Sequence, residues 1–294
     1  MGHNVTDFRP GQRVASFHEM LTPHGSYAEY AVGRAETTFH LPDDVCFEEA
    51  ATIPLAGMTA ALGLYQRLGL PLPWLPAQEC LPLAIYGASS AVGAFAVKLA
   101  SLSNIHPLIC IAGRGSSFVE TLLDRSKGDT IIDYRDGKDA VVSGIKSSLN
   151  GKKLQYAFDA VGDNGSYQNL AEVMGGDGGK ITVVLARKKY EGVPTTTEVL
   201  YTQVGRVHSP MYPGIPGEKK LDGLLNDEDF GAMMFKFFSR GLSKGWFRGH
   251  PFSVAPGGLN GIEDALRNLK DGKVSASKYV FRISDTFEGQ KPHL

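Results

Sequence analysis

The fold is decided by residues 83–93, which read LAIYGASSAVG. The first four residues predict a short buried strand, and the last three open a helix. A strand that ends in a tight turn before a helix directs backbone N–H groups and the helix amino-terminus at one point, which attracts a pyrophosphate. Gly87 would allow the sharp turn, Gly93 would let the helix pack closely on the sheet, and Ser89 and Ser90 add hydroxyl donors. This context favours dinucleotide binding over an ordinary turn, although a serine replaces the middle glycine of the usual GxGxxG pattern.

Strands and helices alternate along the chain after this turn. The apolar runs predict strands at 83–86, 108–112, 130–134, 154–159 and 180–185, and helices at 91–102, 118–125 and 139–149. Strands that are separated by helices indicate a parallel, doubly wound sheet of the Rossmann type. The predicted fold class is therefore α/β.

The segments on either side of this alternation have other patterns. Residues 13–17 and 28–32 alternate apolar and polar side chains and predict short strands, and residues 278–283 predict a final strand. Residues 47–65 predict a helical stretch that is interrupted at Pro54-Leu55-Ala56-Gly57, and residues 229–242 predict an amphipathic helix.

The composition limits the classes of protein. The chain has 294 residues, a net charge of −1 and 43% hydrophobic residues, which is enough for about two domains with a buried core. The near-neutral charge argues against nucleic-acid binding through phosphates, and no apolar run is long enough to span a membrane. The three cysteines are far apart in the sequence, which favours a reducing, cytoplasmic setting over a disulfide scaffold.

The end of the second strand of the alternating region bears on the choice of cofactor. A fold that binds NAD carries a carboxylate there, which holds the ribose 2′-hydroxyl. Residues 111–117 read IAGRGSS and contain no carboxylate. A guanidinium pairs bidentately with phosphate oxygens, so Arg114 and the nearby hydroxyls suit a 2′-phosphate. The sequence therefore favours NADPH over NADH, with a solvated loop cation as the alternative role for Arg114.

Motifs spread over residues 11–283 resemble those of one superfamily. They are GQRVA at 11–15, YAEY at 27–30, EEAATIP at 48–54, GMTAALGLY at 57–65, the serine-rich turn at 89–92, IDYR at 132–135 and GKVSASK at 272–278. The chain resembles the zinc-independent enoyl reductase and quinone reductase branch of the medium-chain dehydrogenase/reductase superfamily, and most of all the stand-alone trans-acting enoyl reductases of fungal polyketide and toxin pathways. The resemblance implies a partial GroES-like β domain from residues 1–60 and 240–294, and an NADP-binding Rossmann domain over residues 61–239.

The resemblance also implies roles for individual residues. Those expected to contact the cofactor are Ala88, Ser89, Ser90, Ala91, Val92, Arg114, Ser116, Tyr134, Val184, Leu185, Val274, Ser275 and Lys278. Those expected to line the substrate side are Met58, Thr59, Ala60, Ala61, Leu62, Gly63 and Leu64. Within the first set, Arg114 and Ser116 would lie at the 2′-phosphate, and Val184 and Leu185 would lie beside the nicotinamide.

The resemblance implies no metal site. Zinc-dependent relatives place a ligand just before the segment that begins at Gly57, where residues 52–56 read TIPLA, and the four-cysteine zinc lobe is also absent. Without zinc as a Lewis acid, reduction of an activated C=C bond is more natural than alcohol oxidation. The sequence names no catalytic residue, and it leaves the proton donor open among Tyr27, Tyr65 and solvent.

The family pattern begins with further strands before its G-D-R-V segment, whereas this chain starts almost at that segment. Because those strands line the family's active site, we expect an incomplete substrate domain, and a catalytically impaired nucleotide-binding protein stays open beside the active reductase. An NADPH:quinone oxidoreductase is a further alternative. The expected partners are an enoyl thioester or another small-molecule substrate and a polyketide synthase, and the expected oligomeric state is a monomer or a dimer.

Overall fold

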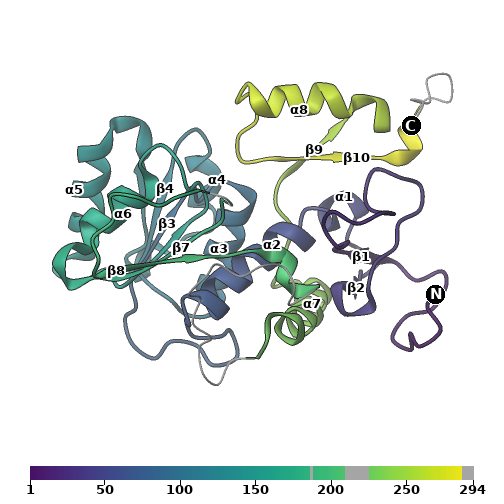
Figure 1. Cartoon of the computed structure of the whole chain (residues 1–294), viewed down its shortest axis with the longest axis horizontal. Helices are drawn as coiled ribbons and strands as arrows, with labels where there is room; N and C mark the ends of the chain where they lie inside the picture. The colour runs from purple at the N-terminus through teal and green to yellow at the C-terminus, as the bar shows by residue number, and fades with distance from the viewer. Residues whose placement is uncertain (186–187, 209–224, 287–294) are drawn as a thin grey trace. The chain divides into compact units, whose positions relative to one another are not determined.

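The computed structural model describes residues 1–185, 188–208 and 225–286 (Figure 1). The chain divides into two compact units. Among the described residues, the sheet unit contains residues 59–185 and 188–204, and the terminal unit contains residues 1–58, 205–208 and 225–286. No helix within these ranges is long and apolar enough to cross a membrane.

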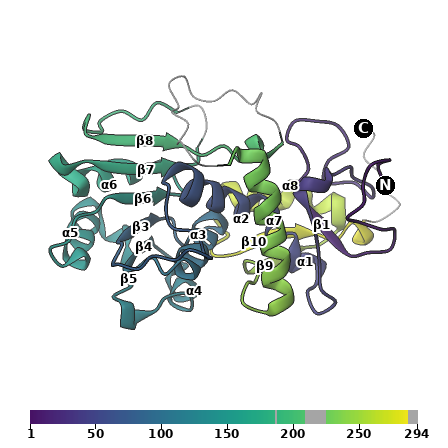
Figure 2. The same ribbon diagram turned by 90° about the horizontal axis from the view of Figure 1, so that it is seen from below.

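The sheet unit is built on six parallel strands, which Figure 2 shows side by side. In spatial order they are β5 (Thr130–Asp133), β4 (Leu108–Ala112), β3 (Leu83–Tyr86), β6 (Tyr156–Asp159), β7 (Gly179–Val183) and β8 (Thr197–Tyr201). The chain order changes direction between β3 and β6, and the carboxyl ends of the strands at such a switch point are where open α/β sheets bind ligands. The parallel sheet confirms the predicted α/β, doubly wound fold class.

Helices cover both faces of the sheet because the side chains of each strand alternate between the faces. Ala84, Ile109 and Ala157 share one buried core with α5 and α6. Phe158 is the neighbour of Ala157 and points to the other face, where its ring meets Gly63 of a π-helix. The covering elements are α3 (Ala91–Leu102), α5 (Lys138–Leu149), α6 (Ser166–Met174) and the π-helix (Leu62–Arg67).

Three central elements begin and end where the sequence predicts, namely β3, α3 and β4. The helix expected at 118–125 is wrong in its extent, since α4 (Ser116–Glu120) stops earlier and a separate 3-10 turn follows at Arg125–Lys127. The reason is local, because the Asp124 side chain accepts a hydrogen bond from the Ser126 N–H and starts a new turn. The sequence patterns do not predict α6 and β8.

The terminal unit contains two small sheets. β1 (Val14–Ser16) pairs antiparallel with β2 (Thr38–His40). β9 (Phe252–Ala255) pairs in parallel with β10 (Lys278–Phe281). The main helices of this unit are α1 (Phe47–Ala50), α7 (Asp227–Lys244) and α8 (Ile262–Lys270).

Aromatic side chains form much of the terminal unit's core. The rings of Phe39 and Phe235 stack with their centroids 5.7 Å apart, and those of Phe238 and Phe247 stack at 5.0 Å. All four side chains are buried. The inner face of α7 is therefore held by ring packing against β2 and against the segment that follows the helix.

Two expectations for the flanking segments are wrong. Residues 28–32 form no strand, because Tyr27 adopts a left-handed conformation with φ +65° and the Val32 N–H donates to the His24 carbonyl, which closes a loop. The interruption in the helical stretch falls at 51–53, and Pro54 instead opens α2 (Pro54–Ala61), which runs on into the π-helix. A proline fits the first turn of a helix because its missing N–H would have no intrahelical acceptor there.

Candidate dinucleotide site

The turn between β3 and α3 brings backbone N–H groups together at the switch point. Gly87 has φ +73°, and a Cβ atom at Gly93 would lie 2.2 Å from the Gly87 carbonyl oxygen, so both positions require glycine. The N–H groups of Gly87 and Ala88 donate to the Ile111 carbonyl at 3.0 and 3.1 Å, which ties the turn to β4. Ala88 therefore helps to shape the turn with its N–H already engaged.

Three donors at this turn stay available for a ligand. The Ser90 side chain caps α3 by accepting a hydrogen bond from the Gly93 N–H at 3.1 Å. The N–H groups of Ser89, Ala91 and Val92 make no hydrogen bond within the described ranges. They lie at the amino-terminus of a twelve-residue helix, where the helix dipole favours an anion. These donors fit the pyrophosphate of a dinucleotide.

The end of β4 holds Arg114, Ser116 and Tyr134 close to one glycine. A Cβ atom at Gly113 would lie 2.5 Å from the Tyr134 ring, so this ring packs on the backbone there. The Ser116 hydroxyl donates to the Gly113 carbonyl at 2.6 Å, while the Arg114 side chain is exposed. The structure thus brings these three predicted cofactor residues together, and residues 111–117 offer no carboxylate that would repel a phosphate.

A carboxylate does stand at the end of the neighbouring strand β5, but it is already engaged. Asp133 accepts hydrogen bonds from the Arg135 side chain at 2.9 and 3.0 Å and from the Arg135 N–H at 2.9 Å. These bonds lower the pKa of Asp133 to about 2. Its charge is therefore balanced by Arg135, and it leaves the end of β4 without a competing anion.

The loop after β6 is organised by Asp159, which the sequence patterns do not single out. This buried carboxylate accepts hydrogen bonds from the N–H groups of Val161 and Gly162, both at 2.9 Å, and from the Ser166 hydroxyl at 2.6 Å. Burial raises the pKa of Asp159 above its usual range, although these hydrogen bonds oppose the shift. A lone acid at the end of a buried strand, three residues before a glycine, is the sequence signal that could have found it.

The loops after β6 and β7 are fastened to each other. Gly162 has φ +67°, and a Cβ atom there would lie 2.9 Å from the Cβ of Leu185. Lys188 donates to the Gly162 carbonyl at 2.8 Å and to an Asp163 carboxylate oxygen at 2.7 Å. The Tyr190 hydroxyl donates to the Leu185 carbonyl at 2.8 Å. These contacts fix Val184, which is half-buried, and Leu185, which is more exposed. Both residues follow β7 and therefore lie at the carboxyl edge of the sheet, which is also the edge of the glycine turn after β3.

The residues expected on the substrate side are all buried. They are Met58, Thr59, Ala60, Ala61, Leu62, Gly63 and Leu64, in α2 and the first half of the π-helix. A Cβ atom at Gly63 would lie 2.3 Å from the Phe158 ring, so the backbone packs directly on the sheet there. Their contact with a substrate stays a prediction.

Tyr65 has a structural role. Its hydroxyl lies 3.1 Å from the Leu99 carbonyl, to which it donates, and 2.9 Å from the Ser103 hydroxyl, while burial raises its pKa. A phenol that is enclosed against α3 and bonded in this way cannot reach a substrate, so Tyr65 is removed from the candidate proton donors.

Val274, Ser275 and Lys278 belong to the terminal unit. Lys278 begins β10, its Nζ donates to the Ala51 carbonyl at 3.4 Å, and burial lowers its pKa. Val274 and Ser275 lie in the loop between α8 and β10. The expected contact of these three residues with a cofactor stays a prediction.

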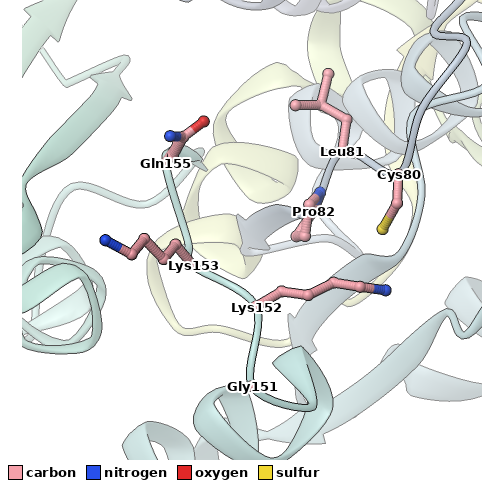
Figure 3. A pocket seen from close by; sticks show the side chains of 7 residues that line it. All are labelled: Cys80, Leu81, Pro82, Gly151, Lys152, Lys153 and Gln155. Carbon is pink, nitrogen blue, oxygen red and sulfur yellow. The ribbon is translucent and has the colours of Figure 1, made fainter.

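A separate cavity of about 440 Å³ lies at the opposite, amino-terminal edge of the sheet (Figure 3). The residues that line it are Cys80, Leu81, Pro82, Gly151, Lys152, Lys153 and Gln155. They precede β3 and β6 in the chain, so the cavity is apart from the glycine turn, which follows β3. The described ranges hold no cluster of three or more His, Cys, Asp or Glu side chains that suits a metal ion.

A glycine turn at the switch point of a doubly wound sheet defines a nucleotide-binding fold of the Rossmann class. No protein-family model matches the chain. The chain is 46% identical over 263 residues to the trans-enoyl reductase fsr4 of Gibberella fujikuroi, an alignment that covers 89% of this chain and 73% of the relative. It is 33% identical over 280 residues to the trans-enoyl reductase ACTTS2 of Alternaria alternata, covering 93% and 77%. The chain therefore belongs to the trans-enoyl reductases.

Solved structures share the fold at low sequence identity. A quinone oxidoreductase from Pseudomonas syringae pv. tomato matches with a TM-score of 0.69 and 20% identity, over 95% of this chain and 78% of that one. The CurK enoyl reductase matches with a TM-score of 0.61 and 17% identity, over 81% of this chain and 63% of that one. The resemblance that the sequence motifs indicate is thus confirmed at the level of family and fold.

Proposed function

We propose that this protein is an NADPH-dependent reductase that saturates the activated C=C bond of an enoyl thioester. The observation that carries the proposal is the set of three available N–H groups at Ser89, Ala91 and Val92, in a chain that is 46% identical to a trans-enoyl reductase. NADPH would supply, when bound, a hydride for the β-carbon of the substrate, and the α-carbon of the resulting enolate would take a proton from solvent or from a protein side chain. The protein's part is to bind, to orient and to exclude water.

Arg114 selects the phosphorylated cofactor in this proposal. It follows β4, where a fold that binds NAD has a carboxylate, and it stands with the Ser116 hydroxyl and the Tyr134 ring around Gly113. A guanidinium binds a 2′-phosphate through paired, charge-assisted hydrogen bonds. The remaining predicted contacts with the cofactor are the backbone of residues 88–92, at the pyrophosphate, and Val274, Ser275 and Lys278.

In this proposal, the loops after β6 and β7, which are bonded to each other, orient the nicotinamide end of the cofactor. Lys188 donates to the Gly162 carbonyl, the Tyr190 hydroxyl donates to the Leu185 carbonyl, and Asp159 holds the base of the loop after β6. A rigid apolar edge here keeps the nicotinamide face in one orientation and keeps water from it, so that hydride transfer meets a preorganised geometry. Met58, Thr59, Ala60, Ala61, Leu62, Gly63 and Leu64 then form the wall behind the substrate.

The substrate is presented by another protein in this proposal. The relatives fsr4 and ACTTS2 are both named trans-enoyl reductases, and we infer that this chain serves a polyketide synthase as a separate protein. The sheet unit would form the cofactor domain, and the terminal unit, which includes all of α7, would form the remaining part of a GroES-like substrate domain.

The test is turnover of purified protein with NADPH and a short enoyl thioester, followed by loss of the reduced nicotinamide absorbance. We expect saturated thioester to form in proportion to the NADPH consumed. Turnover of a quinone in place of the thioester would select a quinone oxidoreductase. Calorimetric binding of NADPH without turnover of either acceptor would identify a nucleotide-binding protein that has lost catalysis.

A further inference from the structure

A row of basic side chains runs along the outer face of α7. Lys236, Arg240 and Lys244 are spaced four residues apart, so they lie one above another on a helix surface, and all three are exposed. The opposite face of α7 is the one held by the buried aromatic rings. We call the three residues the basic ridge; its helix is the long green one in Figure 2.

Close ion pairs among the described residues do not neutralise the positive charges of the basic ridge. Arg240 and Lys244 form no ion pair within the described ranges, and Lys236 has only a long contact of 3.6 Å with Asp7, between two exposed side chains. Exposed pairs of this kind contribute little free energy. The ridge thus presents about three positive charges on a protein whose net charge is −1.

Folding does not account for the ridge. Like charges four residues apart destabilise a helix by a few tenths of a kcal/mol per pair. A cation in the last turn interacts favourably with the helix dipole, which explains Lys244, but this effect fades within one turn and does not reach Lys236. Because folding does not offset this repulsion, the basic ridge suits a role in binding another molecule.

An aromatic side chain stands beside the ridge. The Trp246 ring is 39% exposed and packs over Gly241, where a Cβ atom would lie 2.6 Å from it. It also meets the Phe237 ring, with the centroids 4.8 Å apart. Tryptophan and arginine are the side chains that most often carry the binding energy of protein interfaces. A fixed tryptophan next to exposed cations, of which only Lys236 has an ion-pair contact in the described part of the chain and that a long one, has the composition of a docking surface.

We propose that the basic ridge and Trp246 dock the acidic surface of the protein domain that carries the enoyl thioester. This rests on the proposed function, because it assigns the partner that delivers the same substrate. Three aligned cations match a partner of negative charge, steer its approach and fix its register on α7.

The test compares one enoyl group on two carriers. The 294-residue chain is given crotonyl thioester on N-acetylcysteamine, and the same group on an isolated acyl-carrier domain of net negative charge. The variant is Lys236→Glu with Arg240→Glu and Lys244→Glu. We expect its KM for the carrier-bound substrate to rise about tenfold or more, which corresponds to about 1.4 kcal/mol, while the KM for the small thioester stays within about twofold.

The matched control reverses the same number of charges elsewhere. Lys146→Glu, Lys152→Glu and Lys270→Glu are exposed positions on other elements and give the same net charge as the ridge variant. We expect the control to behave as wild type toward both substrates at moderate salt. An equal effect of the two triple variants on the carrier-bound substrate would overturn the proposal and leave only non-specific attraction.

A binding measurement distinguishes failure of the docking proposal from failure of the proposed function. Trp74→Phe leaves Trp246 as the only tryptophan, so its fluorescence reports on the ridge. We expect titration with the acidic carrier domain to change this fluorescence, with an affinity that falls as salt is raised and is lost in the ridge variant. Failure of turnover with intact binding would refute the proposed function alone, and normal turnover of the small thioester without this binding would refute the docking surface alone.

Discussion

A Cβ atom built on Gly93 would stand 2.2 Å from the carbonyl oxygen of Gly87 and 2.8 Å from its carbonyl carbon. The first turn of α3 is therefore in direct backbone contact with the turn that precedes it. Because the obstacle is backbone rather than the end of a side chain, it cannot rotate away. The geometry of the candidate pyrophosphate site and the packing of the helix thus depend on the same missing methyl group.

We expect Gly93→Ala to lower both cofactor affinity and stability. The added methyl must push the turn away from α3, at a cost of about 1–3 kcal/mol for an overpacked site. The Kd for NADPH should rise at least tenfold by calorimetry, and the melting temperature should fall. Gly176→Ala is the matched control, since a Cβ atom there meets nothing within 4 Å. Wild-type affinity in Gly93→Ala would contradict the assigned role of the turn.

Replacement of Arg114 tests the choice between cofactors. Loss of a charge-assisted contact with a phosphate costs about 1.5–3 kcal/mol, so Arg114→Gln should raise the KM for NADPH about tenfold to a hundredfold. The KM for NADH, which has no 2′-phosphate, should change less than about threefold. Arg267→Gln is the control, because Arg267 is an exposed arginine on α8 that pairs with Glu263 and has no predicted role at the cofactor. Equal losses with both cofactors in Arg114→Gln would refute the 2′-phosphate contact.

Asp159 makes stability depend on pH. Burial raises its pKa in the folded state above the unfolded value, so the stability that it contributes is present at low pH and is lost as the pH rises through the folded pKa. Asp159→Asn keeps an acceptor for the Val161 and Gly162 N–H groups without the charge. Its melting temperature relative to wild type should therefore increase as the pH is raised from about 4, the usual pKa of a free aspartic acid, toward neutral.

The control for this effect is Asp159→Ala, which leaves both N–H groups without their acceptor. It should be destabilised by about 1–3 kcal/mol at every pH in the same thermal melts. If Asp159→Asn loses stability relative to wild type as the pH rises, the hydrogen bonds to the carboxylate outweigh its burial, and the pH argument is wrong.

Tyr65→Phe separates structure from catalysis. The change removes a buried hydroxyl that is bonded to Leu99 and Ser103, so we expect a stability loss of about 1 kcal/mol in denaturant melts. The kcat for the enoyl thioester should stay within about twofold of wild type, because the hydroxyl is enclosed against α3. The exposed Tyr27 offers Tyr27→Phe for comparison. A large fall in kcat for Tyr65→Phe would restore Tyr65 as a proton donor.

The elements around the glycine turn are predictable because several signals agree there. β3 and β4 are unbroken apolar runs that are buried along their whole length, and Ser90 caps α3 at the residue where the pattern starts. α6 lacks such signals, since it begins after Gly165 in a left-handed conformation, with no side-chain cap. β8 is an edge strand and only partly buried, so its pattern is weak.

The residues of the candidate site also differ in how well the sequence predicts them. The donors at Ser89, Ala91 and Val92 follow from one contiguous turn, which a local motif describes. The link between Gly162, Leu185 and Lys188 joins residues from two loops, and only the sheet order brings those loops together. Tyr65 was a candidate acid in the sequence because its residue type suits proton transfer, and tertiary packing alone decides that its hydroxyl is enclosed.

The two units also differ in when the ribosome delivers them. All six strands of the sheet emerge before α7, so the sheet unit is free to fold during synthesis. The terminal unit has to wait, because Phe39 near the start stacks on Phe235 of α7, and β9 gains its partner only when β10 is made. The Phe39 ring of a nascent chain thus lacks its stacking partner until α7 has been made.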